Sequence, residues 1–147
     1  MKHICRILVF MLLVSVLALP AQAASNAAFS DDLAAQVVAY TNSDRARYGL
    51  APLRVDAELT AAARVRAQEL LQKFSHTRPD GSGWSSVSTK AKGENIARGY
   101  RSAAAVTAAW LSSEGHRRNV LRESYGSIGV CAARVNGVIY WVQLFGR

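Results

Sequence analysis

The sequence predicts an α+β fold, namely a three-layer α-β-α sandwich in which a small antiparallel sheet lies between helices. Two observations lead to this prediction. Apolar residues recur at helical spacing through most of the chain and alternate at strand spacing only near the C-terminus. The C-terminal strands are also apolar on both faces, so helices have to cover both sides of the sheet.

The first two helices are marked by capping residues and by breakers. The first helix is expected to begin at a cap formed by Ser30 or Asp31 and to end at Gly49. The second helix follows a cap at Asp56 and runs out near Phe74. Its apolar stripe comprises Leu59, Ala62, Ala63, Ala67 and Leu70, and its mostly outward-facing residues are expected to be Arg64, Arg66, Gln68 and Gln72.

Two shorter helical segments follow in the second half of the chain. One is expected to start at Ser102 and to carry Val106, Ala109 and Trp110 on its apolar face. A short helical turn over residues 116–121 is expected after Gly115. Both segments precede the strands, which gives an order of helices first and strands last.

The dipeptide Asn136-Gly137 predicts a two-residue β-hairpin turn, because both turn positions need a positive φ that these residues adopt at low cost. This turn sets the register of the two strands. The facing pairs on one side are Val135–Val138, Ala133–Tyr140, Cys131–Val142 and Gly129–Leu144. The other side carries Ile128, Val130, Ala132, Ile139, Trp141 and Phe145, with Arg134 and Gln143 as its strongly polar members.

The N-terminus has the three-part pattern of a secretory signal peptide. Lys2 and Arg6 precede an apolar block over residues 7–19, and the small-residue sequence AQA ends at Ala23. The block is shorter than the roughly 20 residues that span a bilayer as a helix. We therefore expect a signal peptide over residues 1–23, a short leader over 24–31 and one domain over 32–147. The domain would be secreted or periplasmic, with no membrane span after cleavage.

Charge and cysteine content narrow the class of protein. The whole chain has a formal charge of +8, and removal of Lys2 and Arg6 with the signal peptide would leave +6. The cations are spread along the chain, which favours solvated helix faces and leaves open an attraction to a lipid or to an anionic envelope component. Nucleic acid is not an expected partner outside the cytoplasm. Cys131 would be the one cysteine of the mature chain, so we expect no intrachain disulfide.

Four side chains are candidates for chemistry: His76, Glu94, Glu114 and His116. Two imidazoles and two carboxylates suit Zn²⁺ or another divalent cation, and they also suit general acid and base work. Their spacing does not join them into a motif, so the fold would have to build any shared site. Taken singly, the histidines are equally compatible with loop or helix-start positions and the acids with solvated surface positions.

Several sequence strings, in the same order over about residues 32–146, resemble the CAP superfamily of cysteine-rich secretory proteins, antigen 5 and plant pathogenesis-related proteins. The chain is most similar to the compact bacterial branch of that family. The strings are NSDR (42–45), YGLAPL (48–53), FSHTRPDG (74–81), GENIA (93–97), AWLSSEGHRRNVL (109–121), IGV (128–130) and YWVQLFG (140–146).

The resemblance implies an α-β-α sandwich with a central cavity where two histidines and two acids meet. By motif, His76 and His116 match the cavity histidines and Glu94 matches the acid of the GEN element. Glu114 does not match as well. In longer family members the second acid lies three residues after this tryptophan, whereas Glu114 lies four residues after Trp110 and two before His116. It either faces the cavity or places a favourable negative charge at the start of a short helix.

Two main functions follow from these residues and from the family resemblance, and a third is less well supported. We favour a secreted binding module, rather than an enzyme, whose cavity holds a divalent cation between His76 and His116, with a lipid or envelope fragment as ligand. The alternative is a peptidase-like, metal-dependent hydrolase in which Glu94 is the general base for a metal-bound water. A hydrolase that uses a serine such as Ser75, Ser112 or Ser113 is less well supported, because the sequence identifies no acid to orient a histidine.

Export is the first testable prediction. The exported protein should begin at Ala24, because the apolar block and the AQA site direct cleavage after Ala23. Intact-mass analysis of the exported chain measures this directly, and a mass that still includes residues 1–23 would contradict the signal peptide.

Overall fold

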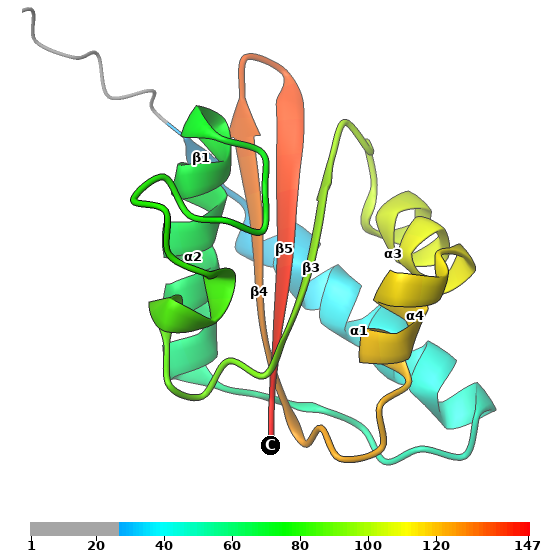
Figure 1. Ribbon diagram of the computed structural model, residues 1–147. Coiled ribbons are helices and arrows are strands. Elements are labelled where there is room, and N and C mark those ends of the chain that lie inside the picture. Colours follow the sequence, from blue (N-terminus) through cyan, green and yellow to red (C-terminus); the bar gives the residue numbers. More distant parts are fainter. Residues whose placement is uncertain (1–26) are drawn as a thin grey trace, which may run out of the picture.

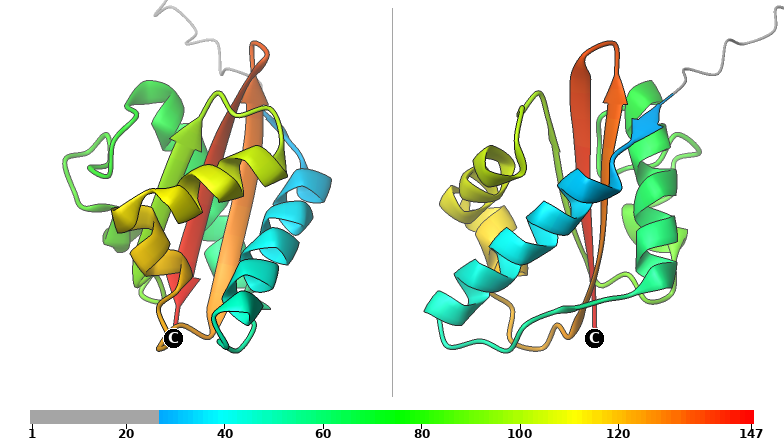
Figure 2. Two further views of the ribbon diagram at one scale, coloured as in Figure 1. Left: turned by 90° about the vertical axis from the view of Figure 1, so that its right-hand side faces the viewer. Right: turned by 180° about the vertical axis from the view of Figure 1, so that it is seen from behind.

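A sheet lies between two helical layers in the computed structural model, which describes residues 27–147 (Figures 1 and 2). The expected signal peptide, with its cleavage site, lies outside the described residues. The elements are β1 (Ala28–Phe29), α1 (Asp31–Arg47), β2 (Arg54–Val55), α2 (Ala57–Gln72), the 3-10 turn η1 (Trp84–Val87), β3 (Gly93–Arg98), α3 (Ala103–Ser112), α4 (Glu114–Val120), β4 (Ser127–Val135) and β5 (Val138–Gly146).

The sheet has the order β1-β4-β5-β3, and the short β2 pairs with β4 in parallel. All other pairings are antiparallel. Helix α2 covers one face of the sheet, and α1, α3 and α4 cover the other (Figure 1). The predicted three-layer α-β-α sandwich is therefore confirmed. The strand β3 forms one edge of the sheet, and this edge carries the candidate site.

The predicted hairpin register is confirmed across β4 and β5. Val135 pairs with Val138, Cys131 with Val142 and Gly129 with Leu144. The turn residue Asn136 has a φ of 48° and Gly137 a φ of 79°, as the turn type requires. A Cβ on Gly129 would overlap the backbone of Leu59, so only glycine lets α2 approach the sheet this closely.

The two faces of the hairpin each have a separate hydrophobic core. Trp141, Ile128 and Phe145 pack under α1 and α3, together with Trp110. Cys131, Val142 and Leu144 pack under α2. This division follows the alternation of side chains along each strand. Burial raises the pKa of the Cys131 thiol to about 12, so this free cysteine is an unreactive part of the core.

The expected caps are present, and the helix bounds differ slightly from the expected ones. Ser30, Asp56 and Ser102 each accept a backbone N–H bond at the start of their helices. Helix α4 begins at Glu114, two residues before the expected turn. Residues 28–31 were expected to belong to a leader, but they form β1 and the start of α1, so the folded domain already includes them.

The other differences concern the unpredicted strands β2 and β3 and one arginine. Because β1, β2 and β3 all precede α3, the expected order of helices first and strands last is wrong. The sequence pattern did not predict β3, because five of its six residues are buried and no alternation of polar and apolar residues marks them. Arg66 was expected on the outer side of the second helix, but it is fully buried. Across the described residues, no helix is long and apolar enough to span a membrane.

Replacing Trp141 tests the predicted burial of the hairpin. Trp141 is 0% exposed and its indole N–H donates to the carbonyl of Tyr100. We expect Trp141→Ala to lower the free energy of unfolding by about 3–5 kcal/mol, as truncation of a large buried aromatic residue does. Denaturant melts measure this change. Coincident melts of the variant and the wild type would contradict the packing of the sandwich.

Candidate functional site

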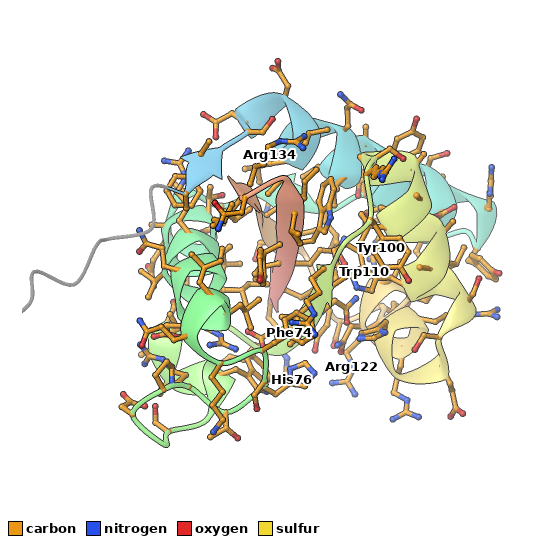
Figure 3. The ribbon with its side chains drawn as sticks, turned by 90° about the horizontal axis from the view of Figure 1, so that it is seen from above. Phe74, His76, Tyr100, Trp110, Arg122 and Arg134 are labelled. Carbon is orange, nitrogen blue, oxygen red and sulfur yellow. The ribbon has the colours of Figure 1, made fainter. Side chains whose placement is uncertain are left out.

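A cleft of about 540 Å³ opens at the β3 edge of the sheet, between α4 and the loop that follows α2. It brings together three of the four candidate residues, His76, Glu94 and His116. Figure 3 labels His76 and Arg122, two of the residues that line this cleft. The remaining lining residues are Trp84, Lys92, Gly93, Gly115, Arg118, Asn119, Arg122 and Tyr125.

Glu94 lies at the base of this cleft on β3, and a buried arginine holds its carboxylate. The side chains of Glu94 and Arg66 are both 0% exposed. Arg66 Nε donates to Glu94 Oε2 over 2.7 Å, and Nη2 donates to Oε1 over 3.3 Å. This two-pronged contact is the favoured geometry for a guanidinium and a carboxylate. It holds Glu94 in one orientation.

The same guanidinium also organises the loop that carries His76. Arg66 Nη1 donates to Glu69 over 2.6 Å, and Nη2 donates to the carbonyl of Ser75 over 2.8 Å. Glu69 in turn accepts three bonds from Arg78 in the same loop. Burial by itself would lower the pKa of Arg66, but the contacts with Glu94 and Glu69 outweigh burial and raise it. Arg66 therefore remains a cation inside the fold.

His76 is held to this buried pair by one ring nitrogen. Its Nδ1 lies 2.8 Å from Glu94 Oε1, and the side chain is 52% exposed. An ionised carboxylate only accepts hydrogen bonds, so Nδ1 carries the proton and donates it. Within residues 27–147, Nε2 has no hydrogen-bond partner in the protein. The neutral ring therefore presents the lone pair of Nε2 to the cleft.

His116 is placed from the opposite side of the cleft by α4 and a buried amide network. Its Nδ1 lies 2.9 Å from Ser113 Oγ, and its carbonyl accepts a bond from Asn95 Nδ2. Asn95 also accepts a bond from Asn119 over 2.9 Å. Burial, followed by repulsion from His76 when that ring is protonated, lowers the pKa of His116. The ring is therefore neutral at pH 7.

Glu114, the fourth candidate, does not line this cleft. It is the first residue of α4, its side chain is 91% exposed, and it pairs with Arg118 over 2.9 Å. The reason is geometric, because residues two apart on a helix do not share a face, and here His116 takes the inward position. Of the two roles weighed for Glu114, the structure matches a negative charge at a helix start and places the side chain outside the cleft that His76, Glu94 and His116 line.

The sequence argument missed Arg66 and the polar residues Asn95 and Asn119. A signal for Arg66 was present, because position 66 continues the buried stripe of α2 at residues 59, 62, 63, 67 and 70. Its charge led to the expectation of an outer position. Asn95 lies on the unpredicted strand β3, and its 0% exposure has no signal in the local pattern.

Comparison with known proteins gives the chain a family. The profile of the CAP, cysteine-rich secretory protein family matches residues 38–145. The protein YkwD of Bacillus subtilis (strain 168) is 38% identical over 120 residues, which cover 76% of this chain and 46% of YkwD. The membrane protein YlbC of the same organism is 32% identical over 118 residues, with 75% of this chain and 33% of YlbC covered. The chain thus spans less than half of these relatives.

Solved structures agree with the family match. An extracellular protein from Bacillus anthracis str. Ames that contains an SCP domain superposes with a TM-score of 0.68 at 29% identity, over 77% of this chain and 39% of that one. An outer surface protein of Borrelia burgdorferi superposes with a TM-score of 0.74 over 84% and 98% of the two chains. Its identity of 20% shows a shared fold alone.

The family profile covers most of the chain, and the fold superposes on that of a similar SCP-domain structure. The chain therefore belongs to the CAP, or cysteine-rich secretory protein, family.

Proposed function

We propose that the chain is an extracellular binding module whose cleft holds a divalent cation such as Zn²⁺ between His76 and His116. One observation carries this proposal. Each imidazole uses Nδ1 for a hydrogen bond within the protein, to Glu94 in one case and to Ser113 in the other. Histidines that bind metals are typically oriented in this way, with one ring nitrogen bonded to the protein and the other directed at the ion.

The donor set fits an open site with exchangeable water ligands. Glu94 is engaged by Arg66 and His76, and Glu114 is directed to solvent. Over the described part of the chain, no group of three or more His, Cys, Asp or Glu side chains is arranged to hold a metal. A structural zinc site has four protein ligands, and a catalytic one usually has three. We therefore propose modest affinity, with the two imidazoles as the protein ligands.

A binding role agrees better with this geometry than a hydrolase does. A general base needs a free lone pair within reach of the water that it deprotonates. Arg66 and His76 take three of the roughly four acceptor positions of the Glu94 carboxylate. The side chain is 0% exposed, so it is poorly placed to reach a water in the cleft. The contact between Ser113 and His116 has no acid to orient it among the described residues, since their hydrogen bonds link no carboxylate to His116.

The proposed location and ligand follow from the relatives and from charge. The similar protein of Bacillus anthracis is extracellular, and the similar protein of Borrelia burgdorferi is an outer surface protein. An exported domain with a net positive charge would meet anionic envelope components and lipid head groups. We propose one of these as the ligand of the cleft.

Zinc titration of histidine variants tests the cation proposal. His76→Ala and His116→Ala should each remove most of the zinc affinity, because each takes away one of two protein ligands. Glu114→Ala is the matched control and should bind zinc as the wild type does, because this carboxylate lies outside the cleft. Calorimetry on folded variants measures the affinities. Unaltered binding by the double histidine variant, or none by the wild type at pH 7, would refute the proposal.

Glu94 needs a milder replacement than alanine in the same experiment. Removing its carboxylate would break the buried ion pair and leave Glu69 as the remaining carboxylate partner of Arg66. Breaking a buried pair typically costs about 3–5 kcal/mol. Glu94→Gln keeps the shape and an acceptor for Arg66. We expect it to weaken zinc binding less than either histidine variant, because Glu94 orients His76 and does not touch the ion.

The zinc affinity should also depend on pH with a defined sign. A protonated imidazole has no lone pair for a metal, so affinity should fall as the pH drops through about 6.5, the ordinary histidine value. The lowered pKa of His116 keeps this ligand available to a lower pH than an exposed histidine. Titrations between pH 5 and 8 measure the change, and a constant affinity over that range would argue against imidazole ligands.

A further inference from the structure

We propose that the cleft contains a subsite for a phosphate ester group, formed by Lys92, Arg118 and Arg122 beside the two histidines. All three cations line the cleft, and the acidic lining residue is Glu94. The charge of Glu94 is neutralised by Arg66, with which it shares a buried ion pair. The field in the cleft is therefore positive. The inference uses the cleft of the proposed function and names its ligand class, but it does not need the metal.

The three cations are available to a ligand. Among residues 27–147, no salt bridge involves Lys92 or Arg122. Lys92 Nζ donates to the carbonyl of Thr89, which leaves its charge uncompensated. Arg118 pairs with Glu114, but both side chains are mostly exposed, at 66% and 91%. Such a surface pair is worth less than about 1 kcal/mol, so an anion can displace Glu114.

The backbone that carries these cations is anchored by buried groups. Arg45 is 1% exposed, and its Nη1 donates to the carbonyls of Val120 and Arg122. The hydroxyl of Tyr125 donates to the carbonyl of Lys92 over 2.7 Å. The guanidinium of Arg122 lies 5.5 Å from the centroid of the Tyr125 ring. Tyr125 thus joins two of the cations, which limits the reorganisation that binding would require.

The anchoring extends to Arg118 and to the edge strand. The neighbouring residue Asn119 donates to the carbonyl of Glu94 over 3.1 Å, which ties α4 to β3. A Cβ on Gly93 would lie 2.6 Å from the hydroxyl of Tyr125 and 3.1 Å from Asn119 Oδ1. Glycine at this position lets β3, α4 and the Tyr125 segment meet closely. The three cations therefore line the cleft from segments that are held close together.

A phosphate ester matches this group of cations better than a single carboxylate. It offers several anionic oxygens, and a guanidinium can bind two of them at once. Two arginines and a lysine supply more donors and charge than one planar carboxylate requires. His116 lines the same cleft. Its neutral Nε2 would face the bound phosphate ester or a cation that bridges to it.

An adjoining groove of about 280 Å³ indicates where the rest of a lipid ligand would lie. It shares His116 with the cleft and is lined by the exposed rings of Phe74 and Tyr100 beside Arg98. Phe74 comes two residues before His76 in the loop after α2, and Tyr100 lines the groove together with Trp110 (Figure 3). A phosphate head in the cleft would leave attached apolar groups next to these rings. A small soluble ester would not use the groove.

Binding of glycerol 3-phosphate in metal-free buffer tests the subsite on the mature chain. We expect binding that weakens with added salt, because the contacts are charged and exposed. Lys92→Gln and Arg122→Gln should each reduce the affinity about tenfold or more, which is typical for loss of a charged hydrogen-bond donor. Arg134→Gln removes the same charge at a site that Figure 3 shows on the far side of the molecule from Arg122, and it should leave the affinity unchanged.

A second arm separates the two sources of phosphate. Phosphatidylglycerol vesicles, compared with phosphatidylcholine vesicles, measure binding to a lipid head group. If the source is a lipid, Arg122→Gln and Phe74→Ser should both reduce vesicle binding. If the source is a soluble ester, Phe74→Ser should leave glycerol 3-phosphate binding intact and the vesicles should show no preference. Either result supports the phosphate subsite.

The inference is overturned if the wild type binds neither glycerol 3-phosphate nor phosphatidylglycerol vesicles. It is also overturned if Arg134→Gln reduces binding as much as Arg122→Gln, since the attraction would then be general. Loss of zinc binding in His76→Ala with phosphate binding retained supports two separate subsites. A wild type that binds phosphate but no zinc would refute the cation proposal alone, and one that binds zinc but no phosphate would refute this inference alone.

Discussion

The buried ion pair of Arg66 and Glu94 is the interaction on which the cleft depends. One guanidinium joins α2, the edge strand β3 and the loop after α2, through bonds to Glu69, Glu94 and the carbonyl of Ser75. Breaking such a pair typically costs about 3–5 kcal/mol, because the remaining charge stays buried without a partner. The pair also fixes the chemistry of His76. The immobile carboxylate of Glu94 accepts a hydrogen bond from the Nδ1–H group of His76 and leaves Nε2 as the nitrogen that faces the cleft.

The opposite wall of the cleft depends on uncharged buried groups. Thr41 on α1, Gln143 on β5, Asn95 on β3 and Asn119 on α4 form a chain of hydrogen bonds across the molecule. Among the described residues, every buried side-chain nitrogen and oxygen has a hydrogen-bond partner. A fully satisfied network of this kind favours one arrangement of the elements. It sets the position of α4, and with it His116 and the cations that face the cleft.

Much of the fold could be predicted from the sequence, but only part of the site. The hairpin was predictable because one dipeptide, Asn136-Gly137, fixes the turn, and a period of two then fixes every facing pair. Residue type and the family resemblance identified His76, Glu94 and His116 as candidates. Their contacts could not be predicted, because they join residues that are distant in sequence. Arg66 and Glu94 are 28 residues apart, and Asn95 and Gln143 are 48 apart. The apolar stripe of α2 marks position 66 as buried, but no local pattern shows which residue pairs with Arg66 there. Nor does a local pattern show that Glu94 is buried while Glu114 is directed to solvent.

The protonation state of His76 tests the central claim most directly. Two-bond ¹H–¹⁵N correlation spectra of the metal-free protein distinguish the two neutral tautomers of each histidine. Because Nδ1 donates to a charged Glu94, we expect neutral His76 to carry its proton on Nδ1 and to have an unprotonated Nε2. A proton on Nε2 would contradict the account, since His76 could not then be oriented by the Arg66–Glu94 pair and would present no lone pair to the cleft.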